Sequence, residues 1–573
     1  MAAGGSAIAY FSMEIGLDPH IPTYAGGLGV LAGDMLRAAA DMAVPMVGVT
    51  LLYRQGYFRQ QLDGAGRQSE SPAPWSPEEF LEPLDARVRL ALEGRSVEIR
   101  AWKKELRGVF GNIVPVYLLD TQLESNSPRD RQITDVLYGG DQRYRLCQEA
   151  VLGLGGVAML DALGHRDVKT YHMNEGHSAL LTLGLLAKTA PDGRVRGWSP
   201  DVEDAIRRQC VFTTHTPVPA GHDQFPFDLV RSVLGDDVVQ VISQSGCCWH
   251  DTLNMTYLAL RLSRYVNGVA QRHSEVSQGM FPRTPINAIT NGVHAVTWTS
   301  PPFQRLFDRH VPQWRHDNQY LRYIISAPLH EIQQAHAESK QLLLEDVRRR
   351  TGVSLSPDVF TIGFARRAAL YKRTDLLFTD REWLLRIVRD VAPLQLVFAG
   401  KAHPRDNDGK AMIQHVTDAA AALGDKLRVL YLPDYDMELG QLMCAGVDLW
   451  LNTPQKPQEA SGTSGMKAAL NGVPSLSVLD GWWIEGHVEG VTGWSIDEDF
   501  LAPSDSARES ESLYHKLERT ILPLYYRRPM EYAKVMRAAI ALNSSFFNAQ
   551  RMLNQYVHNA YWPRNGRDRH DFA

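Results

Sequence analysis

Cysteine is scarce in this 573-residue sequence. The five cysteines are Cys147, Cys210, Cys247, Cys248 and Cys444, and no two of them have CxxC spacing. An odd set without paired spacing argues against both a disulfide framework and a zinc site, and it fits a reducing compartment. The sequence also has no HExxH pattern, and its histidines suggest no shared cluster. We therefore expect no metal site.

Long hydrophobic runs and long runs of one charge are absent too. The N-terminal stretch has no basic region and reaches Glu14 before any useful apolar run, and no uncharged stretch is long enough to span a membrane. The formal net charge is only -5. Such a chain has no electrostatic footprint for nucleic acid or for an anionic membrane. We expect a cytoplasmic protein whose partner is small or neutral.

What the sequence does contain is a repeated alternation of short apolar runs and helical patterns. AIAYFS is followed by GVLAGDMLRAAADM, and VKTYHM by HSALLTLGLLAK. A second series begins near Val359 and comprises VFTIGFA, LQLVFAG, KLRVLYL, DLWLN and PSLSVLD. This alternation predicts parallel sheets covered by helices. Because the chain is longer than one core usually supports, we predict two large α/β domains.

The boundary between these domains is predicted at residues 295–320. Asn291-Gly292 and Pro301-Pro302 interrupt regular structure near this point, and a long helical pattern follows. A last helical pattern covers residues 530–557 and is expected to pack back across both domains, whereas the tail after it is expected to fray. The chain is accordingly divided into three parts, residues 1–300, 301–545 and 546–573.

The sharpest motif is EASGTSGMKAALNG, from Glu459 to Gly472, which lies between the runs DLWLN and PSLSVLD. A loop rich in serine, glycine and threonine that leads into a short helix directs free backbone N–H groups at an anion. Lys467 would lie about one turn into that helix, where a buried amine can react with an aldehyde whose phosphate rests on the loop. A surface lysine after a flexible loop is the plainer alternative, because most lysines are exposed.

A second motif, GFARRAALYKR, follows the run VFTIGFA and brings four cations close together in the sequence, Arg366, Arg367, Lys372 and Arg373. Ligands bind at the C-terminal ends of strands in α/β folds, and convergent guanidinium and ammonium groups suit phosphate dianions. A solvated basic helix start is the alternative interpretation.

A third motif, TYAGGLGVLAGD, places Gly26, Gly27 and Gly29 in the first predicted strand-to-helix turn. Glycines there let backbone amides approach an oxyanion at a helix N-terminus, although a tight structural turn explains these residues equally well.

Polar residues end three further apolar runs, around Asn174, His215 and Asn291. Each could reach a site shared between the domains. We interpret His177 and His222 as structural histidines.

Taken together, these motifs resemble the glycogen and α-glucan phosphorylases. The resemblance covers roughly residues 8–560, and the lysine loop matches that family nearly residue for residue. Ser464-Gly465 and the GWWIEG that follows Asp480 are similar to the short bacterial branch. The resemblance implies an α/β fold with two Rossmann-like domains facing a central cleft, which is the GT-B glycosyltransferase architecture, and a C-terminal helix that crosses back.

The resemblance also implies a role for each motif residue. Pyridoxal 5'-phosphate would be attached to Lys467 and bound by Arg366, Thr463 and Ser464. Catalysis would involve Lys467, Arg367, Lys372, His215 and Glu459. The substrates would contact Gly26, Gly27, Leu28, Asn291, Tyr371, Ser461 and Gly462.

The reaction implied is reversible phosphorolysis of an α-1,4-glucan to α-glucose 1-phosphate with retained configuration. The partners are then an α-glucan or maltodextrin and inorganic phosphate, and a homo-oligomer stays open. Two alternatives remain. One is a nucleotide-sugar glucosyltransferase of the glycogen synthase type, which shares the glycine loop but needs no aldehyde-binding lysine. The other is a catalytically silent glucan-binding protein.

Overall fold

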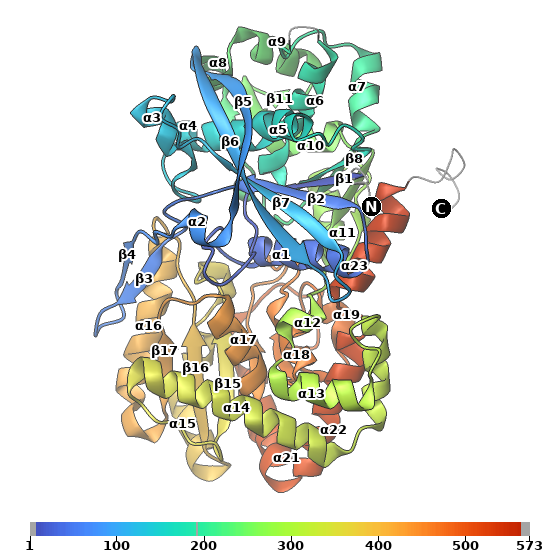
Figure 1. Ribbon diagram of the computed structural model, residues 1–573. Coiled ribbons are helices and arrows are strands. Elements are labelled where there is room, and N and C mark those ends of the chain that lie inside the picture. Colours follow the sequence, from blue (N-terminus) through green and yellow to red (C-terminus); the bar gives the residue numbers. More distant parts are fainter. Residues whose placement is uncertain (1–6, 191–192, 563–573) are drawn as a thin grey trace.

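The computed structural model describes residues 7–190 and 193–562, so the tail that was expected to fray lies outside the described residues. The fold is mixed α/β, as the alternating pattern predicts. Two large sheets with helices on their faces form two lobes, drawn one above the other in Figure 1. We call the lobe of the nine-stranded sheet the first lobe and that of the six-stranded sheet the second lobe.

The nine-stranded sheet has the order β14-β13-β9-β8-β1-β2-β7-β6-β5. Its strands are β1 (Ile8–Ser12), β2 (Met46–Leu51), β5 (Glu82–Leu92), β6 (Arg95–Arg107), β7 (Ile113–Asp120), β8 (Thr170–Asn174), β9 (Cys210–Thr213), β13 (Tyr265–Gly268) and β14 (Asn287–Ala288). The strands from β14 to β7 are parallel, whereas β7, β6 and β5 pair antiparallel. Two small antiparallel sheets accompany it, made of β3 (Arg59–Leu62) and β4 (Gln68–Ser71), and of β10 (Gln224–Pro226), β11 (Cys248–Trp249) and β12 (Thr252–Asn254).

The six-stranded sheet is parallel throughout and has the order β17-β16-β15-β18-β19-β20. Its strands are β15 (Phe360–Ala365), β16 (Leu394–Ala399), β17 (Val429–Leu432), β18 (Leu449–Asn452), β19 (Ser475–Val478) and β20 (Gly493–Ile496). The first five coincide with the five apolar runs of the second series, so those strand predictions are confirmed. Helices cover both faces of such a sheet, which is why its strands read as continuous apolar runs.

The helices of the first lobe are α1 (Gly27–Asp41), α2 (Pro77–Phe80), α3 (Pro128–Arg131), α4 (Gln142–Ala150), α5 (Gly156–Ala162), α6 (Leu181–Thr189), α7 (Pro200–Arg207), α8 (Phe227–Leu234), α9 (Asp236–Ser245), α10 (Met255–Arg261) and α11 (Gln271–Met280). Those that follow are α12 (Ala295–Trp298), α13 (Pro301–His310), α14 (Leu329–Thr351), α15 (Arg381–Asp390), α16 (Asn407–Leu423), α17 (Met437–Gly446), α18 (Ser464–Leu470), α19 (Trp483–Gly486), α20 (Ser506–Lys516), α21 (Leu522–Arg527), α22 (Pro529–Ala538) and α23 (Ala549–Tyr556). Among these described helices, none is both long and apolar enough to cross a membrane.

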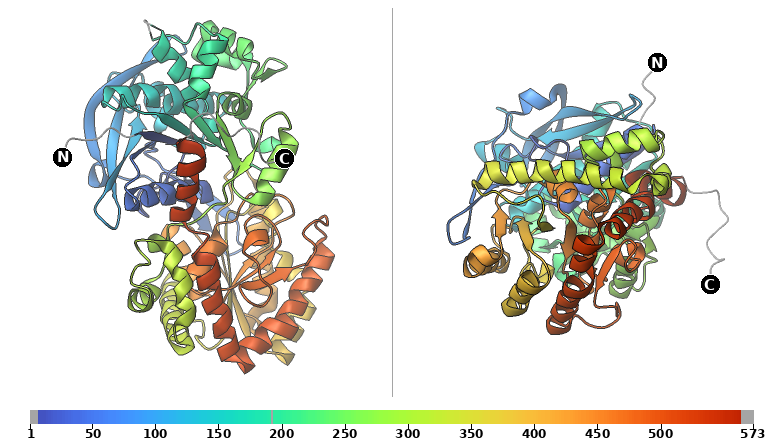
Figure 2. Two further views of the ribbon diagram at one scale, coloured as in Figure 1. Left: turned by 90° about the vertical axis from the view of Figure 1, so that its right-hand side faces the viewer. Right: turned by 90° about the horizontal axis from the view of Figure 1, so that it is seen from below.

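The last helical pattern, residues 530–557, is not one continuous helix. It is interrupted at residues 545–548, and the Asn548 side chain caps the start of α23. Met552, Leu553 and Tyr556 of α23 pack into a core shared with β1 and α1. The C-terminal helix therefore lies against the first lobe, as the two views of Figure 2 also show.

The β3–β4 hairpin joins the lobes from the other direction. Gln60 Nε2 donates to the Gly400 carbonyl at 2.9 Å, and the Gln60 side-chain oxygen accepts the Asp434 N–H at 2.8 Å. Gln68 Nε2 donates to the Ala402 carbonyl at 2.8 Å. In Figure 1 the hairpin lies beside α16. These contacts place the hairpin across the C-terminal ends of β16 and β17.

Candidate active site

Lys467 lies in α18, three residues after the helix begins, as the loop motif predicts. Its side chain is buried, with 7% of the residue exposed, so the alternative of a surface lysine is wrong. The Nζ atom is 3.7 Å from the centroid of the Trp298 ring. Burial lowers the pKa of the Lys467 amine, while the nearby Asp34 acts in the opposite direction. A desolvated amine with a lowered pKa is more readily available as a nucleophile.

The contact between Lys467 and the Trp298 ring was not predicted from the sequence. Trp298 ends α12, and its Nε1 donates to both carboxylate oxygens of Asp34 in α1, at 3.1 and 2.9 Å. Asp34 is fully buried. The two residues are far apart in the sequence, and neither belongs to a motif that signals an amine pocket. Only the three-dimensional fold brings them to Lys467.

The loop before α18 is fixed by backbone packing. Gly481 has φ of +55°, and a Cβ there would come within 2.5 Å of the Ser461 carbonyl oxygen. That same oxygen accepts the Trp482 N–H at 2.9 Å. At the far end, Asn471 and Gly472 terminate α18, with Gly472 at φ of +66°. The serine-rich loop is therefore held in one conformation.

Arg366 and Lys372, two of the predicted cations, both contact Glu459. Arg366, directly after β15, donates to Glu459 Oε2 at 2.5 Å, and Lys372 Nζ donates to the same oxygen at 2.5 Å. Burial alone would raise the pKa of the Glu459 carboxyl, but Arg366 and Lys372 outweigh it and hold the pKa at about 2. Glu459 is thus an anion at neutral pH, locked between two cations.

Arg366 has donor capacity left over. Its Nε and Nη1 atoms are buried and contact no hydrogen-bond acceptor in the described part of the chain. The Ser461 hydroxyl, on the lysine loop, is likewise buried without a partner. Buried polar groups are normally satisfied, so unpaired donors of this kind point to a ligand with acceptor oxygens.

Arg367 and Tyr371 interact directly through their side chains. Burial acts to raise the pKa of the Tyr371 phenol, but the Lys372 and Arg367 charges more than offset this and lower it. Lys372 Nζ also lies 4.5 Å from the Tyr371 ring centroid. Three of the four cations of this motif therefore surround Tyr371 and Glu459.

The fourth cation of the motif, Arg373, to which no site role was assigned, lies apart from the other three. Its backbone has φ of +47°, which ends the short helix Leu370–Lys372 and turns the side chain away. The guanidinium instead donates to the Thr453 carbonyl at 2.9 Å and to the Pro454 carbonyl at 2.7 Å.

The backbone of the glycine-rich turn binds the carboxylate of Glu14. The N–H groups of Ala25 and Gly26 donate to Glu14 Oε2 at 2.6 and 3.2 Å, and the Tyr138 hydroxyl donates to Oε1 at 2.9 Å. Burial raises the pKa of Glu14, while Arg367 is among the groups that lower it. No role in the site was assigned to Glu14 from the sequence, because none of the motifs includes it. Gly27 and Leu28 begin α1, where amides lack an intrahelical acceptor.

His215 and Asn291 follow β9 and β14 of the first lobe. His215 Nε2 lies 2.7 Å from Asn174 Oδ1, and the His215 N–H donates to Glu175 Oε2 at 2.7 Å. Burial lowers the pKa of the His215 imidazole to about 3, so the ring is neutral at pH 7. Asn291 Oδ1 is buried, and no described residue donates to it.

The two histidines interpreted as structural are bonded within the first lobe. His177 Nδ1 lies 3.2 Å from the Arg145 guanidinium, and His222 Nδ1 lies 2.9 Å from the Thr256 hydroxyl. Residues 7–190 and 193–562 contain no group of three or more histidine, cysteine, aspartate or glutamate side chains arranged to hold a metal ion.

Comparison with known proteins points to one family. The model of the carbohydrate phosphorylases matches residues 239–492, which include the lysine loop and the basic motif. The chain is 37% identical to maltodextrin phosphorylase of Thermococcus litoralis, over 97% of this chain and 70% of that protein. It is 36% identical to glycogen phosphorylase of Aquifex aeolicus, over 97% and 86%. It is 31% identical to an uncharacterised protein of Methanocaldococcus jannaschii, over 96% and 99%. The chain belongs to the carbohydrate phosphorylase family.

Proposed function

We propose that this protein is an α-1,4-glucan phosphorylase that reversibly converts maltodextrin or glycogen and inorganic phosphate to α-glucose 1-phosphate. Relatives named maltodextrin phosphorylase and glycogen phosphorylase align over almost the whole chain and support this assignment. The structural observation that carries it is a buried lysine, Lys467, on the same loop as Glu459, which Arg366 and Lys372 both contact.

The residues present fit pyridoxal 5'-phosphate. Lys467 supplies the attachment point, and the Arg366 Nε and Nη1 atoms and the Ser461 hydroxyl are unpaired donors at the same loop. Thr463 and Ser464 form the N-terminus of α18, whose free N–H groups favour a phosphate. When bound, the cofactor supplies a phosphate group whose pKa, near 6, suits proton exchange with a second phosphate.

The other residues have roles that follow from their charge. Two phosphate groups in one site repel each other by about 4 kcal/mol per pair of unit charges at close range for an effective dielectric near 20. Arg366, Arg367 and Lys372 offset this repulsion. His215, neutral at pH 7, orients the sugar through hydrogen bonds instead of through charge. Asn291 offers an unpaired oxygen to a sugar hydroxyl.

We further propose that the two lobes are the Rossmann-like domains of a GT-B glycosyltransferase. His215 follows a parallel strand of the first lobe, and Arg366 and Glu459 follow parallel strands of the second. The C-terminal ends of such strands are where ligands bind in α/β folds. The domain boundaries at residues 300 and 545, the cytoplasmic location and a homo-oligomeric state stay predictions.

A phosphorolysis assay with Lys467→Ala tests the proposal. The purified protein should release glucose 1-phosphate from maltodextrins of graded length only when phosphate is added, and it should show the absorbance of a lysine-bound pyridoxal. Lys467→Ala should lose both, whereas Lys426→Ala, at an exposed lysine of the same lobe, should keep both. Glucosyl transfer from a nucleotide sugar without phosphate would instead support the glycogen synthase type.

A further inference from the structure

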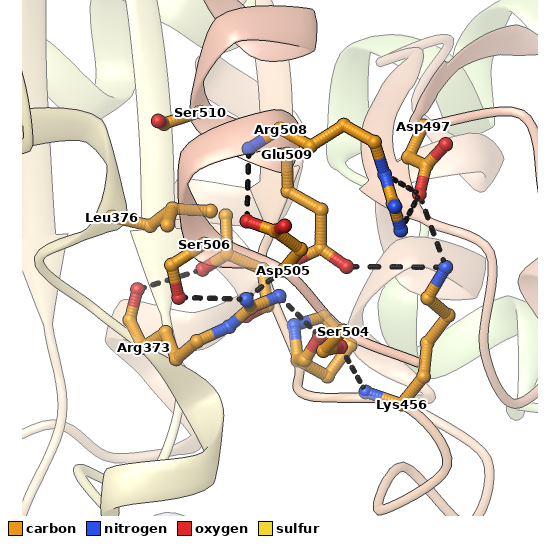
Figure 3. Close-up of polar contacts among 12 residues, drawn as sticks. Arg373, Leu376, Lys456, Asp497, Ser504, Asp505, Ser506, Arg508, Glu509 and Ser510 are labelled. Carbon is orange, nitrogen blue, oxygen red and sulfur yellow. Dashed lines mark hydrogen bonds and ion pairs between the residues drawn. The ribbon is translucent and has the colours of Figure 1, made fainter. Parts of the chain in front are cut away.

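A second group of charged side chains lies beside the candidate site, around the start of α20 (Figure 3). Glu509 is fully buried and forms an ion pair with Arg373, and its Oε1 lies 3.9 Å from Lys456 Nζ. Lys456 Nζ is also 3.3 Å from Asp497 Oδ2, which Arg508 contacts from the other side at 3.0 Å. Within residues 7–190 and 193–562, no donor makes a well-aligned hydrogen bond to either Glu509 oxygen, so the carboxylate is held by opposite charges.

This group holds the segment Thr453–Glu459. Arg373 donates to the carbonyls of Thr453 and Pro454, and the Thr453 hydroxyl donates back to the Arg373 carbonyl at 2.9 Å. The Ser504 hydroxyl accepts the Lys456 N–H at 2.8 Å. The segment is therefore held at Thr453 and Pro454 by Arg373, and at Lys456 by Ser504.

The same segment leads directly to the site. Glu459 is the last residue of the segment, and Lys372 immediately precedes Arg373 in the sequence. The Lys372–Glu459 contact therefore links the same two stretches of chain that the Arg373 hydrogen bonds link. A displacement of Arg373 would be passed on to both members of that contact. Displacements of about 1 Å at such distances can cost orders of magnitude in rate.

A buried ion pair is a weak source of stability, because desolvation offsets most of the attraction. Its geometry is nevertheless well defined, since a buried cation without its counter-charge is very unfavourable. The Glu509 charge therefore determines where Arg373 and Lys456 can lie. No hydrogen bond or ion pair among the described residues joins the Glu509 or Arg373 side chain to a residue assigned to the sugar. Within the segment, the Gln455 N–H donates to the Tyr371 carbonyl at 2.7 Å.

We propose that Glu509 is a positioning residue of the phosphorylase site. Through Arg373 and Lys456, it holds the Thr453–Glu459 segment so that Glu459 stays against Lys372. This inference rests on the proposed function, because Lys372 is taken to bind the substrate phosphate.

Steady-state kinetics of Glu509→Gln tests the inference. We expect the KM for inorganic phosphate to rise about tenfold while the KM for maltodextrin changes less than about twofold. The pyridoxal absorbance should be unchanged, since Lys467 rests on Trp298 away from this group. The matched control is Glu511→Gln, on the same helix but with a side chain that is 64% exposed, and it should behave like the wild type.

Further variants make the result decisive. If Glu509 acts through Arg373 and Lys456, adding Glu509→Gln to a variant that already carries Arg373→Gln and Lys456→Gln should raise the KM for phosphate no further. If Glu509→Gln does not fold, Ser504→Ala replaces it in the test. We expect Ser504→Ala to raise the KM for phosphate by less than about tenfold. An active wild type with an unchanged phosphate KM in the folded variants would overturn the positioning role. An inactive wild type would instead refute the proposed function.

Discussion

At the scale of single residues, the site separates two neighbouring carboxyl groups by charge. Asp480 Oδ2 accepts the Glu459 N–H at 2.9 Å, yet only Glu459 is paired with cations. Burial raises the pKa of Asp480 to about 7, and the Glu459 carboxylate adds to this effect. Environment, not residue type, therefore makes one carboxyl an anion and leaves the other close to its protonated form.

This difference predicts a pH dependence of stability. Between the ordinary aspartate pKa of 3.8 and about 7, folded Asp480 binds more protons than the unfolded chain does, so its contribution to stability falls as the pH rises. Over this range, the unfolding free energy of the wild type should decrease relative to that of Asp480→Asn by about 4 kcal/mol. Denaturant unfolding from pH 4 to pH 8 measures it. Asp425→Asn, at an exposed side chain, should show no such trend.

A single glycine also constrains the loop before α18, which is proposed to bind the cofactor. Gly481→Ala and Gly490→Ala each introduce a side chain at positive φ, which costs about 1 kcal/mol. Only at Gly481 does the new Cβ meet the Ser461 carbonyl, whereas the space around Gly490 is open. We expect both variants to lose stability but only Gly481→Ala to lose bound pyridoxal phosphate, by about tenfold in affinity. Equal retention in both would show that the loop tolerates displacement.

At the scale of secondary-structure elements, α23 contacts the backbone at Asn291, which is proposed to bind the sugar. Arg551 donates to the Thr290 carbonyl at 2.6 Å and to the Asn291 carbonyl at 2.9 Å, and it is buried. Burial lowers the pKa of its guanidinium to about 10, so it stays charged at pH 7. The last helix therefore fixes the backbone of a candidate substrate residue.

The geometry of Arg551 should matter more than its charge. Arg551→Lys keeps the charge but cannot reach both carbonyls, so we expect a loss of about 2 kcal/mol in stability and a several-fold higher KM for maltodextrin. Arg537→Lys is the control, because Arg537 donates to the Ala327 carbonyl away from the site. It should lower stability without changing that KM. Thermal unfolding and phosphorolysis kinetics separate the two effects.

The elements also show how far the sequence could predict this structure. The buried parallel strands were predictable, because helices on both faces leave continuous apolar runs. The long antiparallel pair β5 and β6 was missed, since alternate residues of β5 face solvent and leave no apolar run. The break in the C-terminal pattern at residues 545–548 was also missed, because helical periodicity continues across it.

The candidate site divides in the same way. Arg366, Lys372, Glu459 and Lys467 lie in local motifs, and the sequence alone identified them. Trp298, Asp34 and Glu14 were missed because their contacts join distant parts of the chain. The direction of the Arg373 side chain could not be predicted, since a left-handed backbone conformation is not visible in a basic run. Spacing in a sequence predicts which residues share a loop, but not where each side chain points.

At the scale of the whole molecule, polar contacts of the β3–β4 hairpin help to join the two lobes. Gln60→Ala removes the bonds to Gly400 and Asp434, and we expect the unfolding free energy to fall by about 1 to 3 kcal/mol. Gln61→Ala, at the exposed neighbouring position, should have little effect. Hydrogen exchange at residues 432–437 should quicken only in Gln60→Ala. Equal exchange in both variants would mean that the hairpin does not hold the lobes together.

The contact of Lys467 with Trp298 would let the absorbance of the proposed pyridoxal phosphate report on refolding. Trp298 is hydrogen-bonded to Asp34 in the first lobe, whereas Lys467 belongs to the second lobe. The surroundings of the Lys467 amine are therefore complete only after the two lobes have docked. In a second lobe that has folded but not yet docked, we expect Lys467 to be hydrated. The yellow colour should consequently emerge late, and a stopped-flow trace of its appearance would time the docking of one half on the other.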